Sequence, residues 1–261
     1  MVRHLKRSYI YLIFAFLYMP IAVLMVYSFN DARSRGMWGG FTLRWYVELF
    51  QDRTIMHSLY ATLIIGASSA VLATIIGTMA AIGIHNSKGP AKKVIMNVTY
   101  LPVLNPEIVT AISLMLLFVF TRVRFGYLTL LLSHISFNVP YVILSVLPKL
   151  RQLNKHLYEA ALDLGCTPLQ ALWKVIIPEI MPGIVTGLLL AFTLSIDDFV
   201  ISFFTTGSGV STLSITVYSM ARRGINPKIN ALSTIMFTFV LALLIVVNVR
   251  QAREERKERN G

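Results

Sequence analysis

Long stretches without a formal charge constrain the fold of this chain more than any other feature. Such stretches cover residues 8–30, 54–87, 94–121 (interrupted only by Glu107), 125–148, 180–221 (interrupted by two aspartates) and 229–249. A helix needs about 20 residues to cross a bilayer. Because 56% of the residues are hydrophobic and only 14% are charged, we expect an all-α membrane protein with six transmembrane helices, the fifth over about 179–204.

The two ends of the chain and its basic residues predict the topology. The N-terminal run of 23 uncharged residues is too long for a signal peptide, so we interpret it as an uncleaved first helix. Lys and Arg are more frequent in the N-terminus, in the loops 88–93 and 149–179 and in the C-terminal tail than in the segments between them. This bias predicts that both termini are cytoplasmic and that residues 205–221 form an outer loop with a short helix. The net charge of +12 is therefore attributed to membrane orientation and not to nucleic-acid binding.

The chain carries no recognisable catalytic or metal-binding pattern. Its one cysteine, Cys166, cannot form an intrachain disulfide or a Cys-based metal site. The sequence contains neither the glycine-rich lysine loop that binds ATP phosphates nor an H-E-x-x-H or G-x-S-x-G motif. We therefore expect no catalytic residue, metal or bound cofactor, and any ATP-driven step would take place on a separate subunit.

The cytoplasmic loop at 150–178 predicts two short helices. Its first apolar face repeats every three to four residues and ends at Gly165, where a helix commonly takes a left-handed residue. Thr167, Pro168 and Gln170 then form a capping-box pattern that opens a second helix. Pro178 is expected to mark the start of the fifth span. From these residues alone, the loop is either a connector on the membrane surface or a docking element for a cytoplasmic partner.

The same loop resembles the EAA loop of ABC importer permeases. The matching positions are Glu159, Ala160, Ala161, Gly165 and the segment 175–178 that ends at Pro178. Val175 and Ile177 depart conservatively from the family pattern. The resemblance implies a type I importer fold, with a single permease domain over 1–261 and a core over 57–250. It also implies that the first short helix docks into an ATPase subunit.

Four further stretches resemble spermidine/putrescine importer permeases of the PotC type. They are LYMPIAVLMVYSFN (17–30), FTLRWY (41–46), LPVLNPEIVTAISL (101–114) and FTLSIDDFVISFFTTG (192–207). This resemblance implies a subunit of the bacterial cytoplasmic membrane that pairs with a second, related permease. The implied partners are a cytoplasmic ATPase dimer that uses ATP-Mg and an extracytoplasmic polyamine-binding protein.

Acidic residues inside the apolar runs are the candidate substrate contacts, because a carboxylate in lipid is costly. If the fifth span is one helix, Asp198 shares a polar stripe with Ser195, whereas Asp197 points about 100° away toward neighbouring helices. Asp198 is therefore the predicted contact for a polycation. The other candidates for the substrate path are Glu107, Asp197, Ser195, Trp45 and Tyr46.

Two alternatives remain open from the sequence. The same fold could import another solute, such as ferric ion, thiamine or an anion, although acidic path residues disfavour anions. The aspartates could instead be the ion sites of an ion-coupled carrier. The sequence does not distinguish spermidine from putrescine as the preferred cargo.

Overall fold

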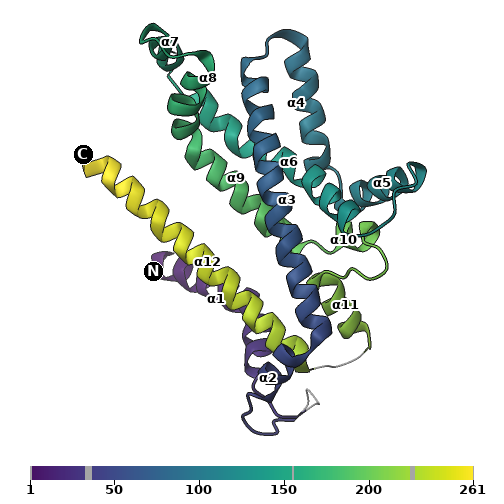
Figure 1. Cartoon of the computed structure of the whole chain (residues 1–261). Helices are drawn as coiled ribbons and strands as arrows, with labels where there is room; N and C mark the ends of the chain where they lie inside the picture. Colours follow the sequence, from purple (N-terminus) through teal and green to yellow (C-terminus); the bar gives the residue numbers. More distant parts are fainter. Residues whose placement is uncertain (1, 33–36, 155, 224–226, 261) are drawn as a thin grey trace. The chain divides into compact units, whose positions relative to one another are not determined.

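A computed structural model describes residues 2–32, 37–154, 156–223 and 227–260. All regular elements in these ranges are helical, and the one β feature found there is an isolated bridge between Asn30 and Phe41. The all-α class is therefore as predicted. The chain divides into two compact units, Met1–Met56 with Val217–Gly261, and His57–Thr216 (Figure 1).

The first unit contains α1 (Val2–Tyr27), α2 (Arg44–Gln51) and the whole of α12 (Pro227–Asn260). Helix α12 packs against both α1 and α2. Lys228 at the start of α12 forms an ion pair with Asp52 at 3.2 Å, and Arg44 pairs with Asp31 at 3.4 Å. Acidic partners therefore accompany basic residues on the side of the chain that is predicted to lie outside the cytoplasm.

The second unit contains the helices that surround the candidate site. They are α3 (Arg53–Asn86, from His57 onward), α4 (Gly89–Leu104), α5 (Glu107–Phe120), α6 (Tyr127–Gln152), α7 (His156–Asp163), α8 (Pro168–Ala171), the π-helix η1 (Leu172–Ile176), α9 (Ile177–Asp197), α10 (Val200–Thr205) and the start of α11 (Leu213–Arg223). The short helix α11 confirms the helix that we expected between residues 205 and 221.

The core of the second unit forms where α3, α6 and α9 meet. Small residues recur every three to four positions on one face of α3, at Gly66, Ala70, Ala73, Gly77 and Ala80. Ala70 and Ala73 of this face are completely buried. A Cβ at Gly77 of α3 would lie 2.7 Å from the Val142 side chain of α6, and one at Gly187 of α9 would lie 3.2 Å from the same side chain. Small residues thus let the three helices approach closely, as packing in lipid requires.

Four described helical segments are long and apolar enough to cross a membrane: Tyr9–Tyr27, Arg53–Asn86, Tyr127–Gln152 and Pro168–Asp197. The pair α4 and α5 could form a fifth span, but it is bent by 106°. The span that we predicted over 94–121 is therefore present only as this sharply bent pair, and its single crossing of the membrane stays a prediction. The bend falls at Asn105 and Pro106, because proline disfavours helical backbone at the residue before it. The apolar part of α12, Pro227–Ala242, is shorter, so the count of six spans stays a prediction.

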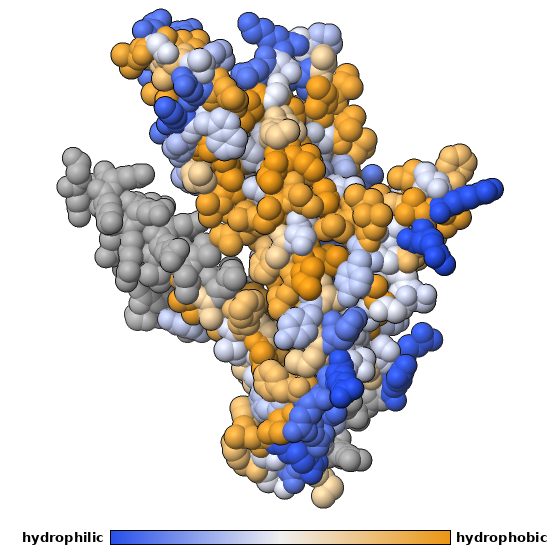
Figure 2. Space-filling view, viewed as in Figure 1, coloured by the Kyte–Doolittle hydropathy of each residue, from blue (hydrophilic) through white to orange (hydrophobic). Residues whose placement is uncertain are grey.

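The outward side of α3 carries many exposed apolar side chains. Figure 2 shows apolar residues over the visible face of α3 and α4, with hydrophilic residues gathered around the turn that joins these helices and around α7. The exposed apolar residues of α3 include Tyr60, Ile64, Val71, Leu72, Ile75, Ile76 and Met79. Such a surface fits contact with lipid or with another membrane subunit.

The fifth span begins earlier than we predicted. Helices α8, η1 and α9 follow one another without a break, so the second short helix of the loop runs directly into the span. The N–H of Ile177 bonds to the carbonyl of Leu172, which is the i−5 spacing of a π-helix. This turn immediately precedes Pro178, whose missing N–H already interrupts the α-helical ladder. Pro178 therefore lies within a continuous helix and does not mark its start.

Candidate functional site

The fifth span ends in a helix break at Asp198. Helix α9 stops at Asp197, and Asp198 adopts an extended backbone with ψ 125°. Its carboxylate oxygens accept hydrogen bonds from the N–H of Ile201 at 3.0 Å and the N–H of Ser202 at 2.7 Å. Aspartate is among the strongest helix N-caps, because its side chain satisfies the free N–H groups of the first turn. Asp198 thus begins α10, and the predicted continuous helix to residue 204 is wrong.

The two adjacent aspartates lie in opposite environments. Asp198 is 7% exposed, and its Oδ2 lies 3.6 Å from Nε2 of His134 on α6. The same Nε2 lies 3.1 Å from the hydroxyl of Ser202. Asp197 is exposed. Asp198 is therefore the buried residue and Asp197 the exposed one, which is the reverse of our expectation. That expectation assumed one continuous helix through both residues, and the helix ends between them.

Ser195 is buried and holds helices together. Its hydroxyl accepts a hydrogen bond from Nδ2 of Asn138 on α6 at 2.7 Å and lies 3.0 Å from the hydroxyl of Ser69 on α3. It therefore does not line an open face of α9 beside Asp198, as the predicted stripe required. Its role in a substrate path stays a prediction.

Glu107 lies at the second break, as the first residue of α5 after the bend. Its side chain is exposed, and α5 packs against α10 around a small cluster that contains Ala111 and Ile201. Glu107 lies within electrostatic range of both Asp197 and Asp198. Two helix breaks thus bring three carboxylates into one region. Figure 1 shows the backbone of α5 beside α10.

Two residues of this region, both on α6, are not among the predicted site residues, although His134 is buried as expected of an isolated core histidine. His134 contacts the carboxylate of Asp198, and the hydroxyl of Tyr141 lies within electrostatic range of Glu107. Both belong to α6, and Asn138 lies between them. Polar residues at 134, 138 and 141 are spaced four and three apart, which places them on one helix face. That spacing is the signal that could have revealed them.

Trp45 and Tyr46 belong to the first unit, where both have structural partners. Trp45 is 3% exposed, and its indole N–H donates a hydrogen bond to the carbonyl of Asn30 at 2.8 Å. The guanidinium of Arg44 lies 4.3 Å from the centre of the Trp45 ring. The Tyr46 hydroxyl lies 2.6 Å from that of Ser28. A cation–π contact with Trp45 thus already exists within the chain, and the proposed contact of either residue with substrate stays a prediction.

The loop at 150–178 confirms the predicted helix signals. Helix α7 ends at Asp163 and is followed by Gly165, which has φ +84°, and the N–H of Cys166 bonds to the carbonyl of Ala161 at 3.0 Å. This is the Schellman arrangement that favours glycine. Thr167 and Gln170 form the predicted capping box, with reciprocal bonds of 3.3 and 3.0 Å. Lys155, one of the basic residues of this loop that predict the orientation of the chain, lies outside the described residues.

The outer surface of this loop is well suited to a protein contact. The Glu159 side chain is 70% exposed and lies 3.1 Å from His156, whereas Ala160 is exposed and Ala161 packs inward. Large apolar side chains also face outward, namely Leu164, Leu169 and Trp173. An apolar patch beside a charged residue is typical of an interaction site.

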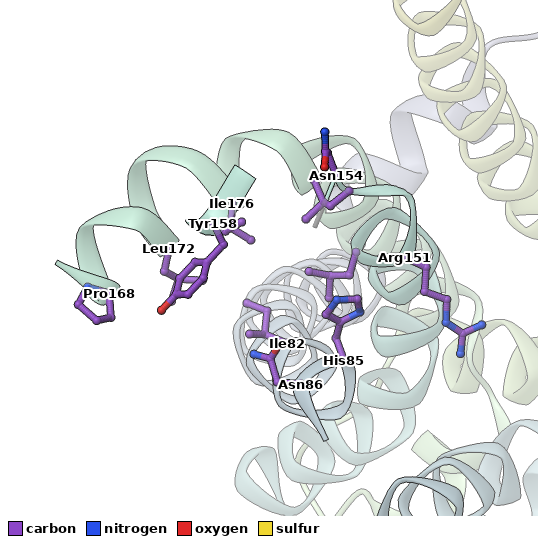
Figure 3. Close-up of a pocket in the computed structure, with 11 residues that line it drawn as sticks. Ile82, His85, Asn86, Arg151, Asn154, Tyr158, Pro168, Leu172 and Ile176 are labelled. Carbon is purple, nitrogen blue, oxygen red and sulfur yellow. The ribbon is translucent and has the colours of Figure 1, made fainter. Parts of the chain in front are cut away.

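A cavity of about 460 Å³ separates the loop from the helix ends beneath it. Figure 3 shows Tyr158, Leu172 and Ile176 of the loop region on one side of this cavity. Ile82 and His85, near the end of α3, lie on the other side. Ile82 and Ile176 also pack against the common core of α3, α6 and α9, so the cavity lies at the edge of that core.

Together, these features define a class of membrane-spanning protein with a helical loop that exposes apolar and charged side chains. The family model described as "Binding-protein-dependent transport system inner membrane component" matches residues 73–259. The chain belongs to this family, and it is a multi-pass protein of the inner membrane and a transport subunit, not itself an enzyme.

Curated relatives match nearly the whole chain. A permease of Shigella flexneri named "Spermidine/putrescine transport system permease protein PotC" is 36% identical over 259 residues, which are 99% of this chain and 97% of the relative. The "Putrescine transport system permease protein PotI" of Escherichia coli (strain K12) is 38% identical over 256 residues, which are 94% of this chain and 89% of the relative.

Solved structures share the fold. A chain of a bacterial ABC transporter that imports the acidic polysaccharide alginate aligns with a TM-score of 0.72 at 15% identity, covering 96% of this chain and 95% of the other. A chain of the inward-facing methionine ABC transporter MetNI aligns with a TM-score of 0.60 at 19% identity, covering 77% and 98%. The type I importer fold is thus as expected.

Proposed function

We propose that this chain is a permease subunit of an ATP-driven importer of polyamines, with spermidine and putrescine as the cargo. The observation that carries the proposal is the pair of exposed carboxylates, Glu107 and Asp197, at two neighbouring helix breaks. The names of curated relatives that match nearly the whole chain support the same cargo.

The side chains at and near the two helix breaks are suited to binding a flexible polycation. Carboxylates bind the ammonium groups, and two carboxylates on separate helices can contact two amines of one chain. The half-buried ring of Tyr141, near Glu107, adds an aromatic face worth about 0.5–2 kcal/mol toward a cation. Asp198 accepts two backbone N–H groups and supports the break, so Asp197 is the better candidate for direct contact.

The fifth span connects this region directly to the docking loop. The helix runs without a break from Pro168 to Asp197, which corresponds to about 45 Å at 1.5 Å per residue. In the proposed cycle, an ATPase dimer that binds ATP-Mg docks on α7 and on the exposed side chains of the loop. Its closure moves the loop against the cavity, and the continuous helix transmits this movement to Asp197.

The proposal includes two further partners. A second, related permease completes the path around the exposed acidic residues, and an extracytoplasmic binding protein delivers the polyamine. Tight binding belongs to the delivery protein, because a transport path must also release its cargo.

Reconstitution tests this function. The chain is assembled in proteoliposomes with its partner permease, ATPase and binding protein, and ATP-dependent uptake of radiolabelled spermidine is measured. We expect unlabelled spermidine and putrescine to compete, and ferric ion, thiamine and sulfate not to compete. Uptake of one of the latter solutes in place of spermidine would overturn the cargo. Transport by this chain alone, without any ATPase, would instead support an ion-coupled carrier.

A further inference from the structure

Among the completely buried polar residues of helix α6, His134 and Asn138 lie one turn apart. Among the described residues, Nδ1 of His134 and Oδ1 of Asn138 have no protein hydrogen-bond partner. Burying polar groups in this way is unfavourable unless the hydrogen bonds that these side chains do make compensate for it.

Asn138 joins three helices just before the break. The Ser69 hydroxyl donates its hydrogen to the carbonyl of Gly66 at 3.2 Å, so the Ser195 hydroxyl donates to Ser69. Ser195 in turn accepts from Nδ2 of Asn138 at 2.7 Å. Each hydroxyl has one hydrogen, and this order uses each of them once. The last turn of α9 is thereby fixed to α6 and α3.

His134 makes the next contact along α6, at the break itself. Its Nε2 lies 3.1 Å from the Ser202 hydroxyl and 3.6 Å from Oδ2 of Asp198. An unpaired buried N–H is rarer than an unpaired acceptor, so the environment favours a proton on Nε2 and leaves Nδ1 as a lone pair. This tautomer presents the N–H of His134 to the hydroxyl and the carboxylate that begin α10.

We propose that His134 is a positioning residue: its Nε2–H holds Asp198 and Ser202 at the helix break and thereby fixes the place where Asp197 meets the cargo. His134 does not touch the polyamine and acts through Asp198. This inference rests on the proposed function, because its effect is expressed as affinity for a polyamine during transport.

Three substitutions of His134 separate this role from simple packing. The amide nitrogen of Gln can reach the place of Nε2, whereas that of Asn reaches only the place of Nδ1, and Leu fills the volume without a donor. Leu130→Ala is the matched control. Leu130 is also completely buried on α6, one turn earlier, but its side chain has no polar atom and makes no hydrogen bond. The initial rate of spermidine uptake is measured against the concentration of spermidine-loaded binding protein in reconstituted complexes, together with the melting temperature of each complex.

We expect KM to rise roughly tenfold in His134→Leu and in His134→Asn, and to stay near the wild-type value in His134→Gln. Leu130→Ala should lower the melting temperature and leave KM unchanged. The double variant His134→Leu with Asp198→Asn should have nearly the same KM as Asp198→Asn alone. Both changes act on the same interaction, the one between His134 and Asp198, so their effects should not add.

Equal KM values for His134→Gln and His134→Leu would overturn the inference, as would fully additive effects in the double variant. If His134→Leu forms no complex, the comparison of Gln with Asn decides the question by itself. Failure of the proposed function is recognised separately, because the wild-type complex would then take up no spermidine.

Discussion

The Oδ2 atom of Asp198 accepts a hydrogen bond from the backbone N–H of Ser202 at 2.7 Å. This bond places a carboxylate inside the protein as a helix cap and leaves its neighbour, Asp197, exposed. Of the two adjacent aspartates, Asp198 thus has a structural role and Asp197 is accessible. Substitutions at the two positions should therefore have different effects.

Asp198→Ala should destabilise the assembled complex more than Asp198→Asn does. Asparagine keeps a cap oxygen, whereas alanine leaves the N–H groups of Ile201 and Ser202 without an acceptor. Loss of a helix cap costs about 1–2 kcal/mol. Thermal unfolding of the purified complex provides the measurement. Equal melting temperatures for the two variants would show that the cap contributes nothing.

Gly207→Ala should prevent the normal packing of the segment after α10. A Cβ at Gly207 would overlap the backbone carbonyl of Phe125, so the backbone would have to shift. Gly126→Ala is the matched control, because a Cβ there meets nothing within 4 Å and its φ of 166° is extended backbone. We expect a lower yield of folded complex, by size-exclusion chromatography in detergent, for Gly207→Ala alone. A normal yield for both variants would refute the close approach.

Gly165→Ala should weaken coupling between the permease and its ATPase. Gly165 has φ +84° with open space around it, so the requirement for glycine comes from the backbone and not from packing. A left-handed backbone costs an alanine about 1–2 kcal/mol. Stimulation of ATP hydrolysis by the loaded binding protein is the readout, and it should fall while spermidine binding to the delivery protein stays normal. Gly165→Asn should retain more stimulation, because asparagine tolerates this conformation better. Full stimulation in the alanine variant would argue against a role for this turn.

Local signals in the sequence predicted local structure well. The glycine turn after α7, at Gly165, and the capping box at Thr167 could both be predicted, since each depends on a few neighbouring residues. These predictions needed no knowledge of which helices become neighbours.

The arrangement of the acids could not be predicted in the same way. Apolar residues on both sides of Asp198 favour helix continuation, whereas aspartate also favours a new N-cap, and the sequence alone does not decide between them. Once the helix breaks, its phase no longer relates Ser195 to Ser202. The contact of His134 with Asp198 joins two helices that are distant in the sequence, so no periodicity within one helix reveals it.

The kinetics of Asp197→Asn test the account most directly. The exposed carboxylate is removed with little change in volume, and Glu179→Gln, an exposed acid near the other end of α9, serves as the matched control. Initial rates of ATP-dependent spermidine uptake are measured in proteoliposomes that contain the complete complex. We predict that Asp197→Asn assembles normally and takes up spermidine at a rate reduced roughly tenfold, as for loss of a hydrogen bond to a charged group, while Glu179→Gln keeps the uptake rate of the wild type. An unchanged uptake rate in a correctly assembled Asp197→Asn complex would contradict the assignment of Asp197 to the polyamine path.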